Sequence, residues 1–315
     1  MKVVALAGGV GAGKFLRGLV RAVPPADVTA VVNTADDMTL HGLRICPDLD
    51  SVTYWLAGLA DRERGWGRAG ESFRALEEVR HLGGPGWFGL GDLDLGTHLV
   101  RTGWLADGAS LTEVTARLTG ALGVEARVLP MSDDPVGTVV DSIDEDGAAR
   151  SDPFQVYWVG RGARDEVKGV RFEGADGARP ALGVLEAIEE ADAVLLCPSN
   201  PVVSVAPILA VPGLREAVAT RRGRAAGVSP IVGGAPVAGM ADRLMPAVGL
   251  EVSALGAASA YRGLLGGWVV DQRDAALAPR IEEALGMRVA VTDTIMVDDA
   301  VAERAARAAL ELAAG

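Results

Sequence analysis

Short apolar runs alternate with amphipathic stretches along most of the chain. Lys2 to Ala7 is apolar after its lysine and leads into Gly8-Gly9, a pattern typical of a buried strand. Lys14 to Ala22 predicts a helix that ends before Pro24-Pro25, and Val28 to Asn33 predicts a second strand. A strand, a helix and a second strand in this order predict a parallel pair.

The middle of the chain has a different pattern. From Ser51 to Gly123 the periodicity is mostly helical, and no strand is predicted. Ser110 and Glu113 offer a capping box for one of these helices. The predicted helices are Val52 to Ala60, Ser72 to Leu82 and Leu111 to Leu122. We therefore expect residues 51–123 to form a helical insertion in a domain built from residues 1–50 and 124–315.

Strand and helix patterns alternate again after the insertion. Asp144 to Gly147 has the composition of a hairpin turn. The predicted strands are Ala126 to Leu129, Gly137 to Asp141, Val156 to Val159, Ala193 to Cys197, Ala225 to Val228 and Gly267 to Val270. The predicted helices are Leu182 to Ala191, Leu214 to Arg222 and Asp299 to Ala313. This alternation predicts an α/β fold, a Rossmann-like doubly wound and mostly parallel sheet with the helical insertion.

Composition narrows the possible partners and the compartment. The 315 residues are 49% hydrophobic and carry a net charge of −12, which disfavours binding to nucleic acid. The two cysteines, Cys46 and Cys197, lack metal-ligand spacing, which is typical of reduced thiols in a cytoplasm. We find no signal peptide and no apolar run long enough to span a membrane. The sequence predicts a cytoplasmic protein.

A glycine-rich segment follows the first predicted strand. Gly8, Gly9, Gly11 and Gly13 precede Lys14 where a strand leads into a helix, so the backbone N–H groups are expected to bind phosphate. The segment nearly matches a P-loop, but Phe15 replaces the Ser or Thr that binds magnesium, and the dinucleotide-binding spacing is also absent. The alternative is a tight structural turn without a ligand.

Two acidic clusters follow the second predicted strand. Asp36 and Asp37 come directly after it, and Asp48 and Asp50, two residues apart, would face the same way in an extended segment. Magnesium prefers carboxylates together with water and substrate phosphate oxygens, so we expect Mg²⁺ at one of these pairs. The alternative is that Asp37 and Asp50 cap the helices that follow them.

Polar residues also gather in three other segments. Asp92, Asp94, Thr97 and His98 are expected in one polar turn that faces a substrate, although a lone histidine is more often structural. Two loops after predicted strands are candidates to bind the base or ribose of a nucleotide, or are ordinary turns. Their polar residues are Ser199, Asn200 and Ser229.

Several of these motifs together resemble the CofD/FbiA family, the 2-phospho-L-lactate or phosphoenolpyruvate transferases of coenzyme F-420 biosynthesis. The matching strings occur in the family's order over nearly the whole chain. They are Gly8 to Phe15, Val32 to Asp37, His41-Gly42, Cys46 to Asp50, Arg64 to Gly67, Leu90 to Asp94 with Thr97-His98, Leu129 to Asp134, Pro198 to Ser204, Ser229 to Val232 and Gly239 to Asp242. The chain departs from the family pattern at Thr39, Leu93 and Gly96.

The resemblance implies a specific reaction. The terminal ribityl hydroxyl of the deazaflavin Fo attacks a guanosine-diphosphate-linked lactate or enolpyruvate, and GMP leaves in a magnesium-dependent step. It also implies a homodimer. The glycine segment with Lys14, Asn33, Thr34, Ser199, Asn200 and Ser229 would hold the nucleotide, and Asp92, Asp94, Thr97 and His98 would help to hold Fo.

The resemblance also implies which carboxylates act. Asp36 and Asp50 would be the leading metal ligands and catalytic residues, with Asp37 and Asp48 beside them. Phosphoryl transfer depends on positioning and charge neutralisation more than on covalent catalysis. A carboxylate near the metal, such as Asp50, is a candidate acceptor for the proton of the attacking hydroxyl.

Two other functions are compatible with the same motifs. A related branch of this fold binds nucleotide-sugars as a regulatory module without catalysis, and only the transferase is expected to bind Fo. A P-loop kinase is the weaker alternative, because Phe15 replaces the metal-binding hydroxyl.

Overall fold

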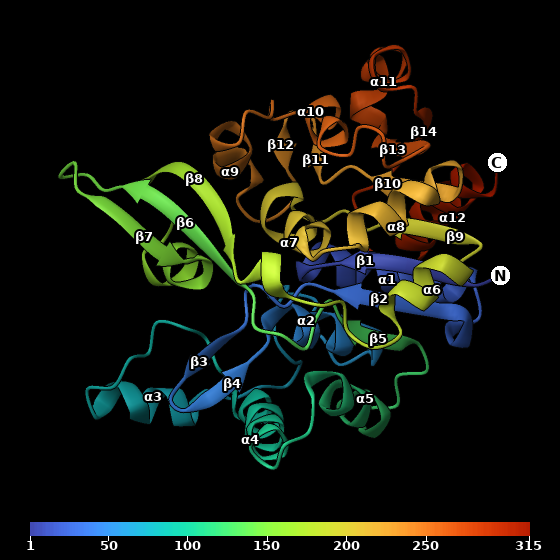
Figure 1. Ribbon diagram of the computed structural model, residues 1–315. Coiled ribbons are helices and arrows are strands. Elements are labelled where there is room, and N and C mark those ends of the chain that lie inside the picture. The colour runs from blue at the N-terminus through green and yellow to red at the C-terminus, as the bar shows by residue number, and fades with distance from the viewer.

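A seven-stranded sheet, parallel throughout, forms the centre of the protein. The computed structural model describes residues 1–315 (Figure 1). The sheet contains β1 (Val3–Ala7), β2 (Val28–Val32), β5 (Arg127–Pro130), β9 (Ala193–Leu196), β10 (Ala225–Val228), β13 (Gly267–Asp271) and β14 (Arg288–Thr292), in the order β14-β13-β10-β9-β1-β2-β5. Every neighbouring pair is parallel. The predicted fold class is confirmed.

The strand order reverses beside β1. The chain moves from β1 to β2 and β5 on one side and later returns to place β9 on the other side of β1. Ligands of open α/β sheets bind beyond the carboxyl ends of the strands at such a point. Gly8 and Ser199 lie there, and the Gly8 amide donates a hydrogen bond to Ser199 Oγ at 3.3 Å.

Both faces of the sheet are covered, which explains the nearly continuous apolar runs of its strands. One face packs against α1 (Gly9–Ala22), α2 (Pro47–Leu56) and α12 (Asp299–Ala314). A Cβ on Gly18 would lie 2.2 Å from the backbone of Ala302, so glycine is required where α1 meets α12. The other face packs against α6 (Val184–Glu190), α7 (Ala206–Ala210), α8 (Leu214–Thr220), α9 (Ala241–Ala247), α10 (Ala254–Ser259) and α11 (Ala278–Leu285).

Residues between β2 and β5 form a hairpin and four helices. The hairpin joins β3 (Met38–Leu40) to β4 (Leu43–Ile45), and α2 follows it. The other helices are α3 (Arg74–His81), α4 (Asp92–Ala106) and α5 (Leu111–Ala121), which lie together at the bottom of Figure 1. The predicted capping box of α5 is confirmed, because Ser110 and Glu113 bond to each other's backbone amides.

A small antiparallel sheet projects from the body of the molecule (Figure 1). It contains β6 (Gly137–Ile143), β7 (Ala149–Pro153) and β8 (Glu166–Glu173) in the order β7-β6-β8. The predicted turn at Asp144–Gly147 joins β6 to β7. The strand predicted at Val156 to Val159 is wrong, because residues 156–160 form one π-helical turn. A further short hairpin joins β11 (Ile231–Val232) to β12 (Ala235–Pro236).

Three segments predicted as loops or extended chain are helical. The glycine-rich segment forms the first turns of α1, which starts at Gly9 and not at Lys14. Leu90 to His98 is not a polar turn, because α4 starts at Asp92. Asp48 and Asp50 lie in the first turn of α2 rather than in an extended segment. In each case the tertiary packing of an apolar face outweighs a local abundance of glycine or aspartate.

No single helix is long and apolar enough to cross a bilayer, although a bent pair, Pro201–Ala210 with Leu214–Thr220 at 94°, meets that test by length and composition.

Candidate active site

The first turn of α1 points its backbone amides at the carboxyl end of the sheet. Gly8 is the N-cap with an extended backbone, and Gly9 has a positive φ of 73°. A Cβ on Gly8 would lie 2.7 Å from Ser204 Cβ, and one on Gly11 would lie 2.5 Å from the Pro198 carbonyl oxygen. These glycines therefore let α1 approach the segment after β9. The free N–H groups of a 14-residue helix make this end suitable for a phosphate.

Lys14 and Gly13 lie against Trp55 of α2. Lys14 Nζ is 5.7 Å from the centre of the Trp55 ring, a cation–π distance. A Cβ on Gly13 would lie 2.4 Å from Trp55 Cδ1, so glycine lets α1 pack on α2. The glycines therefore have a packing role, and phosphate binding at this end of α1 stays a prediction.

Asn33, at the carboxyl end of β2, joins β2 to α2. Its side-chain amide donates to Asp48 Oδ2 at 2.9 Å and to the Val203 carbonyl at 3.2 Å. Its own oxygen accepts from the Ala35 amide at 2.9 Å. Asn33 is fully buried, so these bonds fix the position of Asp48 relative to the end of the sheet.

Asp36 and Asp48 form a pair of buried like charges. Burial, followed by the negative charge of Asp48, raises the pKa of Asp36 well above its usual range. Burial raises the pKa of Asp48 to about 6, although hydrogen bonds from Asn33 and from the Gly9 amide oppose this shift. Asp36 Oδ1 is buried and has no hydrogen-bond partner. The pair lacks a positive charge to neutralise it.

Asp37 faces the β3–β4 hairpin instead. Its Oδ2 accepts from Arg44 Nη2 at 3.1 Å, and its side chain is 1% exposed. Burial raises the pKa of Asp37 to about 7, while the positive charge of Arg44 lowers it. Asp37 therefore has a positive counter-charge in Arg44, whereas Asp36 has none.

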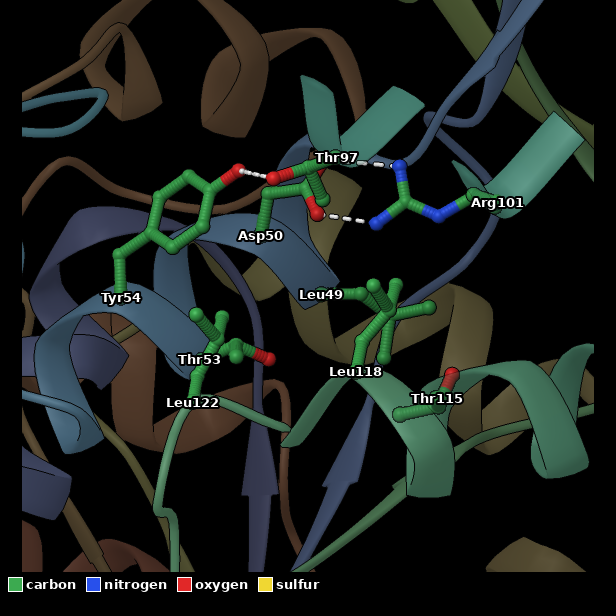
Figure 2. Close-up of a pocket in the computed structure, with 9 residues that line it drawn as sticks. All are labelled: Leu49, Asp50, Thr53, Tyr54, Thr97, Arg101, Thr115, Leu118 and Leu122. Atoms are coloured by element: carbon green, nitrogen blue, oxygen red, sulfur yellow. Dashed lines mark hydrogen bonds and ion pairs between the residues drawn. The ribbon is translucent and has the colours of Figure 1, made fainter. Parts of the chain in front are cut away.

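Asp50 faces away from Asp48, contrary to the expectation that the two face the same way. Residues two apart on a helix point about 200° apart, since each residue turns the helix by about 100°. Arg101 of α4 bonds to both carboxylate oxygens of Asp50, at 3.1 Å to Oδ2 and by a shorter contact to Oδ1 (Figure 2). The Asp50 carboxylate is thereby buried, paired and satisfied.

Asp94, Thr97 and His98 lie in the same buried network as Asp50. Tyr54 of α2 donates to Asp94 Oδ1 at 2.6 Å, and its hydroxyl is 3.0 Å from Thr97 Oγ1. His98 Nε2 lies 3.4 Å from Asp94 Oδ2. Figure 2 shows Asp50 and Tyr54 from α2 pointing toward Thr97 and Arg101 from α4.

A cavity of about 10 Å³ borders this network, enough for about one water molecule. Asp50, Tyr54, Thr97 and Arg101 line it together with Thr53, Thr115 and three leucines. Asp94, Thr97 and His98 are thus buried between helices and do not face an open substrate cleft. Asp92 lies outside the network, where it accepts hydrogen bonds from Ser72 and from the Ala75 amide.

The predicted residues of the two later loops make local contacts. Asn200 Oδ1 accepts from the Val202 amide at 2.9 Å, and Ser229 Oγ donates to the Ile231 carbonyl at 2.8 Å. Ser199 is the exception, because its hydroxyl contacts Gly8 of α1 across the strand-order reversal. Thr34 is buried beside Asn33, and its hydroxyl has no partner.

Arg101 and Tyr54 are the participants that we did not identify from the sequence. A signal for them was present in the helical spacing. Asp94, His98 and Arg101 stand at i, i+4 and i+7, and Asp50 and Tyr54 at i and i+4, which are positions on one helix face. The spacing becomes visible only once residues 90–98 are treated as a helix.

Fold and site together define a Rossmann-like α/β protein with a helix end suited to phosphate beside an unneutralised carboxylate pair. The family described as "2-phospho-L-lactate transferase CofD" matches residues 3–309. The chain therefore belongs to the CofD family of transferases.

Similar proteins from two kinds of organism support this membership. A phosphoenolpyruvate transferase of Streptomyces griseus is 49% identical over 315 residues, covering 99% of this chain and 98% of the relative. A 2-phospho-L-lactate transferase of Methanosarcina acetivorans is 42% identical over 294 residues, covering 93% of each chain. A crystal structure of a UPF0052-family protein from Bacillus halodurans aligns with a TM-score of 0.60 at 21% identity, covering 93% of this chain and 92% of its own, and shows the likeness in fold.

Proposed function

We propose that this protein transfers a phosphoenolpyruvyl group from a guanosine-diphosphate-linked donor to the terminal ribityl hydroxyl of the deazaflavin Fo. The hydroxyl oxygen forms a bond to the phosphorus nearest the acid, the bond from that phosphorus to the GMP oxygen breaks, and the hydroxyl proton is lost to a base. The observation that carries this proposal is the CofD match over residues 3–309.

Enolpyruvate is the favoured acid of the donor. Relatives named phosphoenolpyruvate transferase from Streptomyces and Nocardia are 44–50% identical to this chain. The relatives named 2-phospho-L-lactate transferase from Methanosarcina are 40–42% identical. The donor specificity left open by the motifs is therefore proposed from this difference in similarity.

The nucleotide diphosphate is proposed to lie at the start of α1. The Gly8 and Gly9 amides already bond to Ser199 and Asp48, so the amides of Val10 and Gly11 are the ones proposed to face the diphosphate. Lys14 adds a positive charge on the same helix. Ser199 and Asn33 hold the adjacent strand ends in place through the hydrogen bonds to Gly8 and Asp48.

The residues present fit Mg²⁺ at Asp36 and Asp48. These are two buried carboxylates, one with a partnerless oxygen, and the charge of Asp48 raises the cost of ionising Asp36. A bound Mg²⁺ would neutralise the charge of the donor phosphates. Asp50 is less suited than Asp36 to bind a metal or to accept a proton, because Arg101 already bonds to both of its oxygens.

Asp37 and Asp50 are accordingly assigned to positions near the metal rather than to its coordination. The ligand atoms of Asp50, Asp94 and His98 also lie within 4.8 Å of one another, close enough to share an ion. The Arg101 guanidinium occupies that space and would repel a cation. The chain is further proposed to be cytoplasmic and to form a homodimer. Light scattering of the purified protein tests the homodimer.

Fo consumption is the direct test of the reaction. The purified protein is incubated with Fo, Mg²⁺ and either the enolpyruvyl or the lactyl donor, and product and GMP are separated by chromatography. We expect product mainly from the enolpyruvyl donor and none with EDTA. Asp48→Asn should be inactive, whereas the matched control Asp146→Asn, in an exposed turn, should keep full activity.

The outcome separates the transferase from the regulatory module. If nucleotide binds but neither donor yields product and Fo fluorescence does not respond to the protein, the catalytic proposal fails. The same fold would then be better described as a nucleotide-binding regulatory protein. Product formed only from the lactyl donor would overturn the assigned acid and leave the reaction type intact.

A further inference from the structure

Arg101 is a buried guanidinium that joins three elements. It is 2% exposed and lies on α4. It bonds to Asp50 in the first turn of α2, and its Nη1 lies 3.4 Å from the carbonyl of Arg44 in β4. Thr102, the next residue, accepts a hydrogen bond from the Arg44 amide at 2.8 Å. One turn of α4 therefore holds the chain on both sides of Cys46.

The protonation of His98 follows from its neighbour Arg101. Arg101 Nη1 lies 3.1 Å from His98 Nδ1. Because a guanidinium can only donate, we assign the lone pair to Nδ1 and the ring proton to Nε2, which faces Asp94. Tyr54 donates to Asp94 and the Arg101 guanidinium bonds to Asp50, whereas His98 Nε2 lies 3.4 Å from Asp94 Oδ2 without a hydrogen-bond partner. Each carboxylate of this network therefore has a hydrogen-bond donor from the chain itself.

The held segment is the one that carries the proposed metal ligands. Asp36 and Asp37 precede the β3–β4 hairpin and Asp48 follows it. The position of residues 37–50 therefore fixes the distance between Asp36 and Asp48. Arg44 of that hairpin bonds to Asp37 at 3.1 Å. Asp48 and Asp50 lie on opposite sides of α2, and a rotation of α2 that moves Asp50 also moves Asp48.

Two contacts thus set the rotation of α2 from opposite sides. Asn33 holds Asp48 from the sheet, and Arg101 holds Asp50 from α4. We propose that Arg101 is a positioning residue that orients Asp48 toward Asp36 for a divalent cation without itself contacting substrate. This inference rests on the metal site of the proposed function.

Arg101→Lys tests the role, because lysine keeps the charge but has one nitrogen in place of the two that bond to the Asp50 carboxylate. Mn²⁺ binding is measured by electron paramagnetic resonance of the free ion, with GDP present, on the full chain. Partners of metal ligands typically change metal affinity by about 10–100-fold, and we expect a rise in the Kd of Arg101→Lys in this range. The matched control is Arg161→Lys, which alters the Arg161–Asp165 pair outside the site, and it should leave the Kd unchanged.

The activity readout separates positioning from catalysis. In the Fo assay, Arg101→Lys should raise the Mg²⁺ concentration needed for half-maximal rate by the same factor. At saturating Mg²⁺ its kcat should stay within about threefold of the unaltered protein, because no transition-state contact is lost. A kcat that stays more than about a hundredfold low at saturating metal would instead make Arg101 a catalytic residue and overturn the inference.

A second variant covers the case in which Arg101→Lys does not fold, as judged by circular dichroism. Thr102→Val removes the hydroxyl that holds the Arg44 amide and changes no charge. It should raise the Mn²⁺ Kd by about tenfold, the lower end of the effect for such partners. Unchanged Mn²⁺ affinity in the folded variants would overturn the inference.

Failure of the proposed function is distinguishable from failure of this inference. If the unaltered protein binds Mn²⁺ and the variants bind it more weakly, but no product forms from Fo, the positioning role stands and the reaction is wrong. If the unaltered protein binds no Mn²⁺ with GDP present, the metal site is wrong and the inference fails with it.

Discussion

The two sides of α2 carry carboxylates in contrasting surroundings. Asp50, toward α4, is bonded through both oxygens to Arg101 and belongs to a network with His98, Asp94 and Tyr54. Asp48, toward the sheet, faces another buried carboxylate, Asp36, whose Oδ1 has no partner. The two residues are alike in burial, at 7% and 6% exposure. They differ in whether the fold neutralises them.

The contrast shows which cluster is structural and which is available for ligands. A buried charge without a counter-charge costs stability, and such groups persist mainly where function requires them. The Asp50 cluster has the larger set of potential metal ligands but already contains its own cation. The number of carboxylates is therefore a poorer guide to a metal site than the balance of charge around them.

Replacing Asp36, one member of the unneutralised Asp36–Asp48 pair, should have the largest effect on activity. We expect Asp36→Asn to lower kcat/KM by about 10³-fold, roughly 4 kcal/mol of transition-state stabilisation. Relief of the repulsion should also stabilise the metal-free protein at pH 7, because burial and the negative charge of Asp48 raise the pKa of Asp36. Urea unfolding in EDTA checks the second part. A variant that is both inactive and less stable would contradict the claim that the Asp36–Asp48 pair costs stability.

Removing the Arg101 cation, which pairs with Asp50, should have the opposite effect on stability. Arg101→Met leaves Asp50 buried without a partner, and we expect a loss of about 3–5 kcal/mol in the free energy of unfolding. The comparison variant is Arg161→Met, where the arginine is 28% exposed, and its loss should be about 1 kcal/mol or less. Equal losses in the two variants, measured by urea unfolding, would show that Arg101 is not the central contact of its network.

The pH dependence of stability should also separate the two sides. Burial raises the pKa of Asp48 to about 6 and that of Asp37 to about 7, so the folded state binds protons more tightly than the unfolded chain. The stability from these protons is present below the unfolded pKa of about 4 and is lost as pH rises toward about 7. In EDTA, the free energy of unfolding should therefore fall from pH 5 to pH 8 relative to the Asp48→Asn variant. A difference that is flat with pH, measured by urea unfolding, would remove Asp48 as a group of raised pKa.

The smallest expected effect is at the edge of the paired network. Tyr54→Phe removes one hydroxyl that donates to Asp94 at 2.6 Å, and we expect a loss of about 1–2 kcal/mol in stability. The kcat of the folded variant should stay within about twofold. A large loss of kcat without a loss of stability would move Tyr54 into the site.

Much of the sheet could be predicted from the sequence. The strand at Ala225 to Val228 was predicted to the residue, and β1, β2, β9 and β13 within one residue at each end. Buried parallel strands are nearly continuous apolar runs between turns, so they are visible without tertiary information. β14 of this sheet and β8 of the small sheet were missed, because both are partly exposed and include charged residues.

The helical parts of the site were harder to predict. Gly9 to Gly13 and Asp92 to Gly96 have poor helix propensity, so local preference argued for loops there. Packing of α1 on α12 and of α4 on α2 decides otherwise. As a result, the residues at 36, 37, 48, 50 and 94 were identified as chemically important, while their grouping was not.

The sequence by itself determined the types of residue, the order of the motifs and the α/β class, because apolar periodicity and turn residues are local properties. Only the tertiary structure decided which charges meet. Asp50 lies two residues from Asp48 in the chain, yet its partner Arg101 is 51 residues away. A helix starting at Pro47 turns the two carboxylates to opposite sides, and burial then makes the presence or absence of one guanidinium decide which of them is satisfied.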